Sequence, residues 1–90
     1  MKTIQRDNGI FYIEDNEQRV AELAYEQEGS FMVITHTQVS ETEQGRGLAT
    51  ELVENAVNFA REHGLKIKPV CSFAKTVIDE HSEFQDVLEK

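Results

Sequence analysis

The sequence contains one cysteine, one proline and no tryptophan among its 90 residues. A single cysteine excludes a disulfide within the chain and fits a reduced cytoplasmic setting. No apolar run approaches the length of a membrane span, and the N-terminus lacks the apolar stretch of a signal peptide. We therefore expect a cytoplasmic protein with no membrane partner.

Basic residues are also scarce, because nine lysines and arginines stand against 17 aspartates and glutamates. The formal net charge of −8 argues against a nucleic-acid partner, which requires a basic surface. What the chain does contain, 39% apolar and 29% charged residues, is typical of a soluble globular protein. This length and composition predict a single domain, residues 1–90. We expect a monomer or a weak homodimer, although neither length nor composition decides between them.

The acidic and basic residues are unevenly distributed along the chain. Residues 1–45 carry three basic and nine acidic side chains, and residues 76–90 carry one and five. Only residues 46–75 are net positive, with five basic and three acidic side chains. Such a local positive field favours an anionic ligand, although counts this small also arise by chance.

The N-terminal half of the chain has the pattern of β-strands joined by tight turns. Asn8-Gly9 is a strong signal for a two-residue hairpin turn. Residues 31–39 form the longest β-type run, and their apolar side chains on both faces indicate a central strand. The predicted strands span residues 2–7, 10–14, 20–27 and 31–39.

The strongest helical pattern in the chain runs from Gly45 to His63. Gly64 follows as a typical helix-terminating glycine, whereas the N-terminal end lacks a Ser, Thr, Asp or Asn cap. A bound anion could supply the acceptors that a capping side chain would otherwise provide. The apolar residues that recur at helical spacing are Ala49, Leu52, Val53, Ala56, Val57 and Ala60.

After this helix, residues 65–71 predict a fifth strand, and residues 73–80 and 83–88 predict two short helices. Pro69 within the strand indicates an edge or a bulge, because proline cannot donate a ladder hydrogen bond. A strand–helix–strand unit usually returns parallel with a right-handed crossover, so the fifth strand should run parallel to the fourth. Three aromatic residues are assigned to the core rather than to a ligand site: Tyr25, Phe73 and Phe84.

Between the fourth strand and the long helix lies a glycine-containing loop, Gln44-Gly45-Arg46-Gly47. Its glycines let the backbone approach a ligand closely, and the helix that follows begins with amides that have no internal partner. Such a helix start attracts anions, most simply the phosphates of a cofactor. The loop is not a P-loop, because no lysine followed by Ser or Thr comes after its second glycine. It is not a dinucleotide fingerprint either, since the next strand offers lysines rather than an acidic residue.

The residues Gln44-x-x-Gly47-x-Ala49 resemble the pyrophosphate-binding signature of the GNAT acyltransferases, which follows a strand and begins the central helix. The resemblance covers most of the chain, from about residue 21 to residue 84. It is closest to a minimal GNAT-like subfamily of small single-domain acetyl-CoA-binding proteins. That subfamily has a His-Thr pair before the loop and a Pro-x-Cys-Ser-Phe segment after the helix. Here these are His36-Thr37 and Pro69-Val70-Cys71-Ser72-Phe73.

The resemblance implies an α+β fold with the three-layer α/β arrangement of GNAT proteins. It comprises an antiparallel four-stranded meander, a central helix, a fifth strand parallel to the fourth and splayed from it, and short C-terminal helices. In this family the acyl-pantetheine arm of the cofactor inserts between the two splayed strands. Full GNAT enzymes are longer and carry additional helices that build the acceptor site, so an amine-binding half is hard to find here.

Carried over residue by residue, the resemblance places acetyl-CoA, a coenzyme A thioester, at the glycine loop. The loop backbone would hold the pyrophosphate, and Val39 stands at the strand end that pairs with the pantetheine arm. Taken alone, these residues are also compatible with an ordinary glycine-rich helix start. The implied cofactor-binding residues are Val39, Gln44, Gly45, Arg46, Gly47, Leu48, Ala49 and Thr50.

Cys71 and His36 are the candidate catalytic residues. Cys71 could accept the acyl group as a thioester, line the pantetheine tunnel, or be a small buried hydrophobic residue. His36 could act as a general base for an amine or for Cys71, although a lone histidine on an apolar strand is more often structural. The two form a pair only if both side chains face one pocket. His63 and His81 lack companions of the metal-ligand type, so no metal is expected.

The resemblance thus implies an N-acetyltransferase that uses acetyl-CoA as donor to an unknown amine acceptor, a small molecule or a protein. Many family members use a tyrosine after the fifth strand to protonate the departing thiolate, and here Tyr12 and Tyr25 both precede it. The alternative is a non-catalytic acyl-CoA-binding or sensing module of the same fold, completed by a partner or a second copy. A phosphate-binding domain for another nucleotide is a weaker third interpretation.

Overall fold

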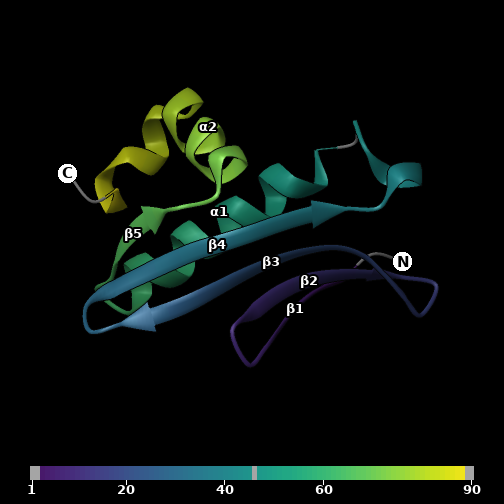
Figure 1. The fold of residues 1–90 in the computed structure, drawn as a ribbon, viewed down its shortest axis with the longest axis horizontal. Helices are drawn as coiled ribbons and strands as arrows, with labels where there is room; N and C mark the ends of the chain where they lie inside the picture. The colour runs from purple at the N-terminus through teal and green to yellow at the C-terminus, as the bar shows by residue number, and fades with distance from the viewer. Residues whose placement is uncertain (1–2, 46, 89–90) are drawn as a thin grey trace.

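The computed structural model describes residues 3–45 and 47–88, and Figure 1 shows how their elements are arranged. Within these residues five strands form one sheet, and helix α1 lies across it. None of the described helices is long and apolar enough to cross a membrane. The elements are β1 (Thr3–Asp7), β2 (Ile10–Asp15), β3 (Gln18–Glu28), β4 (Phe31–Val39), the 3-10 helix η1 (Glu41–Glu43), α1 (Leu48–Glu62), β5 (Lys66–Pro69), α2 (Ser72–Glu80) and the 3-10 helix η2 (Ser82–Val87).

The first hairpin forms at the predicted turn. Asn8 and Gly9 have φ angles of 48° and 87°, the left-handed values that a tight two-residue turn requires. Glycine is needed here for a second reason, because a Cβ at this position would lie 3.0 Å from the backbone oxygen of Tyr25. Tyr25 in turn donates its backbone N–H to the Gly9 oxygen at 2.8 Å, so the hairpin is held close to β3.

β1 to β4 form the predicted antiparallel meander, and β5 pairs with β4 in the predicted parallel direction. β4 has a neighbour on each side, as its apolar content indicated. The register between β3 and β4 shifts at one point, where Tyr25 pairs with Ile34 but Ala24 pairs with His36. Thr35 is the extra residue of this β-bulge, and it changes which face each later residue of β4 occupies.

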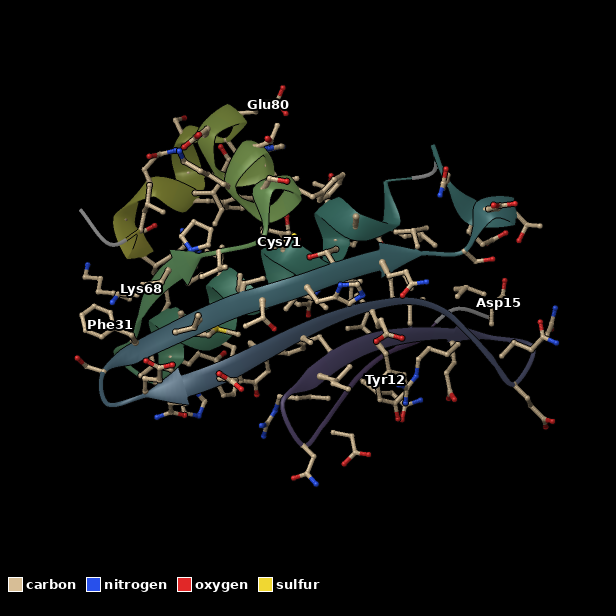
Figure 2. All side chains as sticks on the ribbon, viewed as in Figure 1. Tyr12, Asp15, Phe31, Lys68, Cys71 and Glu80 are labelled. Atoms are coloured by element: carbon tan, nitrogen blue, oxygen red, sulfur yellow. The ribbon has the colours of Figure 1, made fainter. Side chains whose placement is uncertain are left out.

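The described helices pack on one face of the sheet. Buried side chains of α1, α2 and η2 belong to a single apolar cluster that also contains Ile67 of β5. Val33 is buried on the opposite face and lies outside that cluster, and beside it Lys68 Nζ lies 4.6 Å from the ring centroid of Phe31 (Figure 2). The described residues therefore form two layers, the sheet and the helices that cover one of its faces. The uncovered face carries mostly polar or half-exposed side chains, so it tolerates contact with water.

α1 begins at Leu48, later than Gly45, where the sequence predicted its start. Gly45 and Gly47 have φ angles of 85° and 76°, and these left-handed values cannot continue a right-handed helix. Gly47 is the N-cap, and no side chain caps the helix, as the sequence predicted. The glycine loop is therefore a separate turn in front of the helix rather than its first turn.

The C-terminal end of α1 is closed by its own backbone. Gly64 has a φ of 66° and confirms the predicted helix stop. The amide of Leu65 donates to the Ala60 oxygen at 2.8 Å, and His63 Nδ1 lies 2.9 Å from the Phe59 oxygen. These contacts satisfy carbonyl groups that a helix end otherwise leaves without donors.

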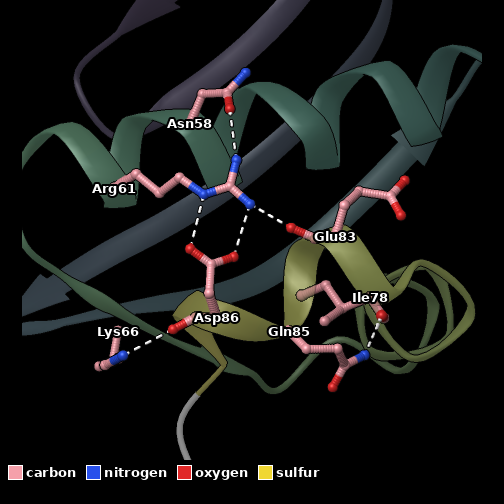
Figure 3. Close-up of polar contacts among 7 residues, drawn as sticks. All are labelled: Asn58, Arg61, Lys66, Ile78, Glu83, Gln85 and Asp86. Atoms are coloured by element: carbon pink, nitrogen blue, oxygen red, sulfur yellow. Dashed lines mark hydrogen bonds and ion pairs between the residues drawn. The ribbon is translucent and has the colours of Figure 1, made fainter.

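Arg61 connects this end of α1 to the C-terminal segment, as Figure 3 shows. Its Nε and Nη2 atoms donate to the two carboxylate oxygens of Asp86 at 2.8 and 2.7 Å, and Nη2 also donates to the Glu83 oxygen. Lys66 Nζ donates to the backbone oxygen of Asp86 at 2.8 Å. The hydrogen bonds from Arg61 hold the pKa of the Asp86 carboxyl below its usual value. Arg61 thus links η2 to α1, and Lys66 links η2 to β5.

β5 is shorter than predicted, because it ends at Pro69 rather than at Cys71. Its pairing with β4 stops at Ile34, whose carbonyl accepts hydrogen bonds from the backbone N–H groups of both Val70 and Cys71 at 3.0 Å. From there the chain turns into α2 while β4 continues, which confirms the predicted divergence of the two strands. Figure 2 shows Cys71 at the start of α2, beside β4.

Candidate functional site

A groove of about 580 Å³ lies at the N-terminal end of α1. The end of β4, the last residue of η1, the glycine loop, the first turn of α1 and one residue of α2 contribute to it. Its lining residues are Thr37, Val39, Glu43, Gln44, Gly45, Gly47, Leu48, Ala49, Thr50 and Phe73. The structure therefore brings the predicted cofactor-binding residues together in one groove, apart from Arg46, which lies outside the described residues.

The first turn of α1 presents backbone donors at this groove. The first hydrogen bond inside the helix runs from the Glu51 amide to the Gly47 oxygen at 3.0 Å. The amides of Leu48, Ala49 and Thr50 consequently have no acceptor among the described residues. A Cβ built on Gly47 would meet no atom within 4 Å, so the space beside the loop is open. These donors and the positive end of the helix dipole together form an anion site.

Side chains contribute little positive charge to this groove. Glu43 is the charged residue among the described residues that line it, so attraction for an anion comes from the backbone. Arg61 and Lys66, two of the cations that make this part of the sequence net positive, are engaged with Asp86 instead. The side chain of Gln44 donates to the Val39 oxygen at 3.4 Å, which fastens the loop to the end of β4.

Cys71 is the N-cap of α2 and lies on the same side of β4 as the groove. Its Sγ donates to Thr37 Oγ1 at 3.6 Å, and Thr37 lines the groove. Burial acts to raise the pKa of the thiol, but the pKa is lowered overall by the Ala74 amide, the Thr37 hydroxyl and the Phe73 amide. The start of α2 and Thr37 thus lower the pKa, without a neighbouring histidine or lysine.

His36 lies on the opposite face of the sheet from Cys71. It pairs with Ala24 beyond the bulge, and its Nε2 lies 3.2 Å from Gln38 Oε1 on the uncovered face. Thr37, the next residue, points toward Cys71. The structure therefore does not bring the two candidate catalytic residues into one pocket, and Thr37 occupies the place beside the thiol.

Thr37 and Phe73 are lining residues that the sequence analysis did not select. Thr37 could have been found, because it lies two residues before Val39 and so shares its side of the strand. Phe73 was predicted to be a core residue, and this was wrong: its side chain is 47% exposed. The buried stripe of α2 runs through Ala74, Val77 and Ile78 and leaves Phe73 at its margin.

The histidines outside β4 have structural contacts. The His63 ring stacks on Phe59 with centroids 4.1 Å apart, and the His81 ring stacks on Phe84 at 5.0 Å. In the part of the chain that the structure describes, no three His, Cys, Asp or Glu side chains are placed to hold a metal ion.

Comparison with known proteins assigns the family. A family model described as GCN5-related N-acetyl-transferase matches residues 10–87. The NMR solution structure of a GCN5-like protein from Staphylococcus aureus is 35% identical, with a TM-score of 0.77 over 97% of this chain and 87% of that chain. The chain therefore belongs to the GCN5-related N-acetyltransferase family. No curated protein matches the sequence significantly.

Two larger proteins are similar to this chain in fold at lower identity. The ribosomal-protein-S18-alanine N-acetyltransferase from Escherichia coli is 14% identical with a TM-score of 0.69, over 79% of this chain and 49% of that chain. An acetyltransferase structure from Clostridium acetobutylicum, solved with acetyl-CoA, is 24% identical with a TM-score of 0.63, over 79% and 54%. The chain spans about half the length of these two proteins, so the likeness concerns the shared fold.

Proposed function

We propose that this protein is an N-acetyltransferase that takes an acetyl group from acetyl-CoA and transfers it to an amine. The observation that carries the proposal is the groove at the N-terminal end of α1, which extends from an anion site toward the divergence of β4 and β5. Acetyl-CoA has a pyrophosphate and, at the far end of its pantetheine arm, a thioester. The groove offers backbone donors for the first, and Cys71 lies beside its Thr37 wall.

In this proposal the backbone from Gln44 to Thr50 holds the pyrophosphate. Val39 and Phe73 provide apolar surface along the pantetheine arm, which leads to Thr37 and the gap between the strands. Backbone amides of β4 beyond Ile34, which no longer face β5, polarise the thioester carbonyl. Family membership and the acetyl-CoA-bound structure of a protein with the same fold support acetyl-CoA as the cosubstrate.

The transfer step uses His36 as the general base on the uncovered face. The amine nitrogen bonds to the carbonyl carbon of the thioester, and the C–S bond breaks as coenzyme A leaves as a thiolate. His36 removes a proton from the attacking nitrogen, and the leaving thiolate takes up a proton to become the free thiol. In this geometry the acceptor approaches from the His36 side, while the donor enters from the side of α1.

Cys71 offers a second route through the same groove. Its thiolate attacks the thioester carbonyl and becomes acetylated as coenzyme A leaves, and the amine then attacks the acetyl-cysteine and releases the thiolate. The lowered pKa of Cys71 supports this route because it raises the thiolate fraction at neutral pH. A cytoplasmic location, where a free thiol stays reduced, fits the same chemistry.

A non-catalytic acyl-CoA-binding module is the second candidate function, and the tyrosines favour it. Tyr25 is buried against Phe11 and Phe59, with ring centroids 5.4 and 5.8 Å away. Tyr12 lies beneath the guanidinium of Arg19, on the uncovered face. Neither lines the groove, so neither is placed to protonate the departing thiolate.

Three measurements separate these functions. Titration with acetyl-CoA, followed by backbone amide NMR, should give saturable shifts centred on Gly45, Gly47 and the first turn of α1. An amine panel should then yield acetylated product, with transfer lost in His36→Ala and, for the relay route, in Cys71→Ser. Intact mass should show an acetyl adduct on Cys71 only if the relay operates. Saturable binding with no product and no adduct would leave the binding module, and no shifts at millimolar ligand would end both interpretations.

A further inference from the structure

A second groove, of about 260 Å³, lies beside the end of β4. It is lined by Arg19, Val20, Ala21, Glu22, Gln38 and Ser40. Val39 lies between Gln38 and Ser40, but it lines the first groove, at the N-terminal end of α1. The same strand end therefore borders two grooves, and the side chain of Gln38 places the second one on the uncovered face with His36.

This second groove contains two opposite charges that do not neutralise each other. The Glu22 carboxylate is half-buried and forms no hydrogen bond or ion pair with any described residue. The Arg19 guanidinium is held 4.1 Å above the ring centroid of Tyr12, and it too lacks a carboxylate partner within the described chain. Both charges border the groove, so each can meet an oppositely charged group of one ligand.

The groove is connected to the proposed general base. His36 Nε2 lies 3.2 Å from Gln38 Oε1, and Gln38 is directly opposite Glu22 in the register of β3 and β4. Residues two apart on a strand are separated by about 7 Å, so Glu22 lies about that far along the sheet from His36. Arg19 lies further along the same line, at the far end of the groove.

From this arrangement we infer that the acceptor is a free amino acid with an amine at the end of its side chain, of the lysine or ornithine class. Its α-ammonium group binds Glu22, its α-carboxylate binds Arg19, and its side-chain amine reaches His36. An extended lysine side chain spans a distance comparable to that between Glu22 and His36. The inference rests on the proposed function, because it names the substrate of that reaction.

Acetyl transfer to this acceptor moves two protons. The side-chain ammonium loses one proton to His36, and the neutral nitrogen bonds to the carbonyl carbon as the C–S bond of the thioester breaks. The new amide nitrogen loses its second proton, which the departing thiolate takes up. The products are the side-chain N-acetyl amino acid and free coenzyme A, and His36 passes its proton to water.

The test compares L-lysine with two analogues of similar length and with a blocked lysine, all at saturating acetyl-CoA. L-lysine carries both α groups, cadaverine lacks the carboxylate, and aminohexanoate lacks the α-ammonium. We expect kcat/KM for lysine to exceed that of each analogue by about tenfold or more, since each analogue loses a charge-assisted hydrogen bond. Nα-acetyl-lysine amide, which mimics a lysine within a protein, should react as poorly as the analogues.

Two variants assign each contact separately. Glu22→Gln should remove the preference for lysine over aminohexanoate and leave the preference over cadaverine. Arg19→Gln should do the reverse. Glu26→Gln is the matched control, because Glu26 is exposed on β3 and lies outside the groove. It should leave both preferences unchanged.

Several outcomes would overturn the inference. Equal kcat/KM for all acceptors, or faster reaction of the blocked lysine, would indicate that the groove does not select a free amino acid. Saturable acetyl-CoA binding with transfer only to other amines would overturn it while leaving the proposed function intact. Amide NMR with L-lysine alone tests the groove without the reaction, and an absence of shifts at Glu22 and Gln38 would also overturn it. Absence of acetyl-CoA binding would instead remove the proposed function.

Discussion

The two ends of α1 are built in opposite ways. At the C-terminal end, backbone and side-chain contacts satisfy the helix carbonyls, and Arg61 ties the end to Asp86. At the N-terminal end, no side chain caps the helix and the first-turn amides face a groove. One end satisfies its own polar groups and supports the fold, whereas the other leaves them available to a ligand.

The difference does not come from the glycines themselves. Gly47 and Gly64 flank the same helix with similar φ angles of 76° and 66°, and a Cβ on either would meet no atom within 4 Å. What differs is the space beyond each glycine, which is the 580 Å³ groove next to Gly47 alone. The same substitution should therefore affect ligand binding at Gly47 and only the stability of the fold at Gly64.

The largest effect is expected from Gly47→Ala. The methyl group enters the groove where the pyrophosphate would lie, so the Kd for acetyl-CoA should rise about tenfold or more, measured by calorimetry. The strained φ should also lower the free energy of unfolding by about 1–2 kcal/mol. Gly29→Ala is the control, because Gly29 has a φ of 60° and open space but lies in the turn between β3 and β4. If both variants bind equally well, the groove is not the donor site.

Gly64→Ala should affect only the fold. A residue other than glycine at a φ of 66° is strained, so we expect the free energy of unfolding to fall by about 1–2 kcal/mol in urea titrations. The Kd for acetyl-CoA should stay at the wild-type value. A weaker Kd in this variant would show that the two ends of α1 are coupled.

Thr37→Val should raise the pKa of Cys71, because the hydroxyl that favours the thiolate is lost. The measurement is the rate of iodoacetamide alkylation against pH, whose midpoint in the folded wild type should lie below that of the urea-unfolded chain. Because folding depresses this pKa, the thiolate contribution to stability is present above the unfolded pKa and disappears as pH falls through the folded one. Thr76→Val, which removes a hydroxyl bonded to the Ser72 oxygen, should leave the midpoint unchanged.

The smallest effect is expected at the C-terminal end of α1, which Arg61 links to Asp86. Asp86→Asn should lower Tm slightly at neutral pH, because it removes an exposed ion pair with Arg61. The pKa of Asp86 is lowered in the folded state, so its contribution is present above the unfolded pKa of about 4 and disappears as pH falls through the folded value. The Tm difference from wild type should therefore shrink in acid. A difference that is constant with pH would contradict the assignment.

The elements that repeat locally could be predicted from the sequence. The strands of the meander and the buried stripe of α1 follow from alternating and helical periodicity, which depend on neighbouring residues. The parallel direction of β5 follows from the crossover rule for a strand–helix–strand unit. The glycine loop could be placed because glycine spacing reports backbone conformation directly. The residue at which the loop ends and α1 begins could not be predicted. Gly45 and Gly47 are compatible with a helix start until their φ angles are known.

The orientation of His36 could not be predicted. Counting by twos from the buried Ile34 places His36 on the side of α1 and Cys71, and the bulge at Thr35 reverses that result. Threonine is common in regular strands, so nothing in the sequence marks the extra residue. The partner of Arg61 and Lys66 could not be predicted from the sequence either. Asp86 lies far from both along the chain, and the two are brought together only because the chain folds back after α2.

The uncapped start of α1 also has a consequence for hydrogen exchange. The amides of Leu48, Ala49 and Thr50 have no acceptor among the described residues, so their hydrogens should exchange with deuterium faster than those of the hydrogen-bonded turns of α1. The Glu51 amide, bonded to the Gly47 oxygen, should exchange more slowly and serves as an internal reference. A bound anion would slow the first three relative to the fourth. The exchange rates at the start of α1 therefore report whether an anion is bound there, and no enzymatic assay is needed to measure them.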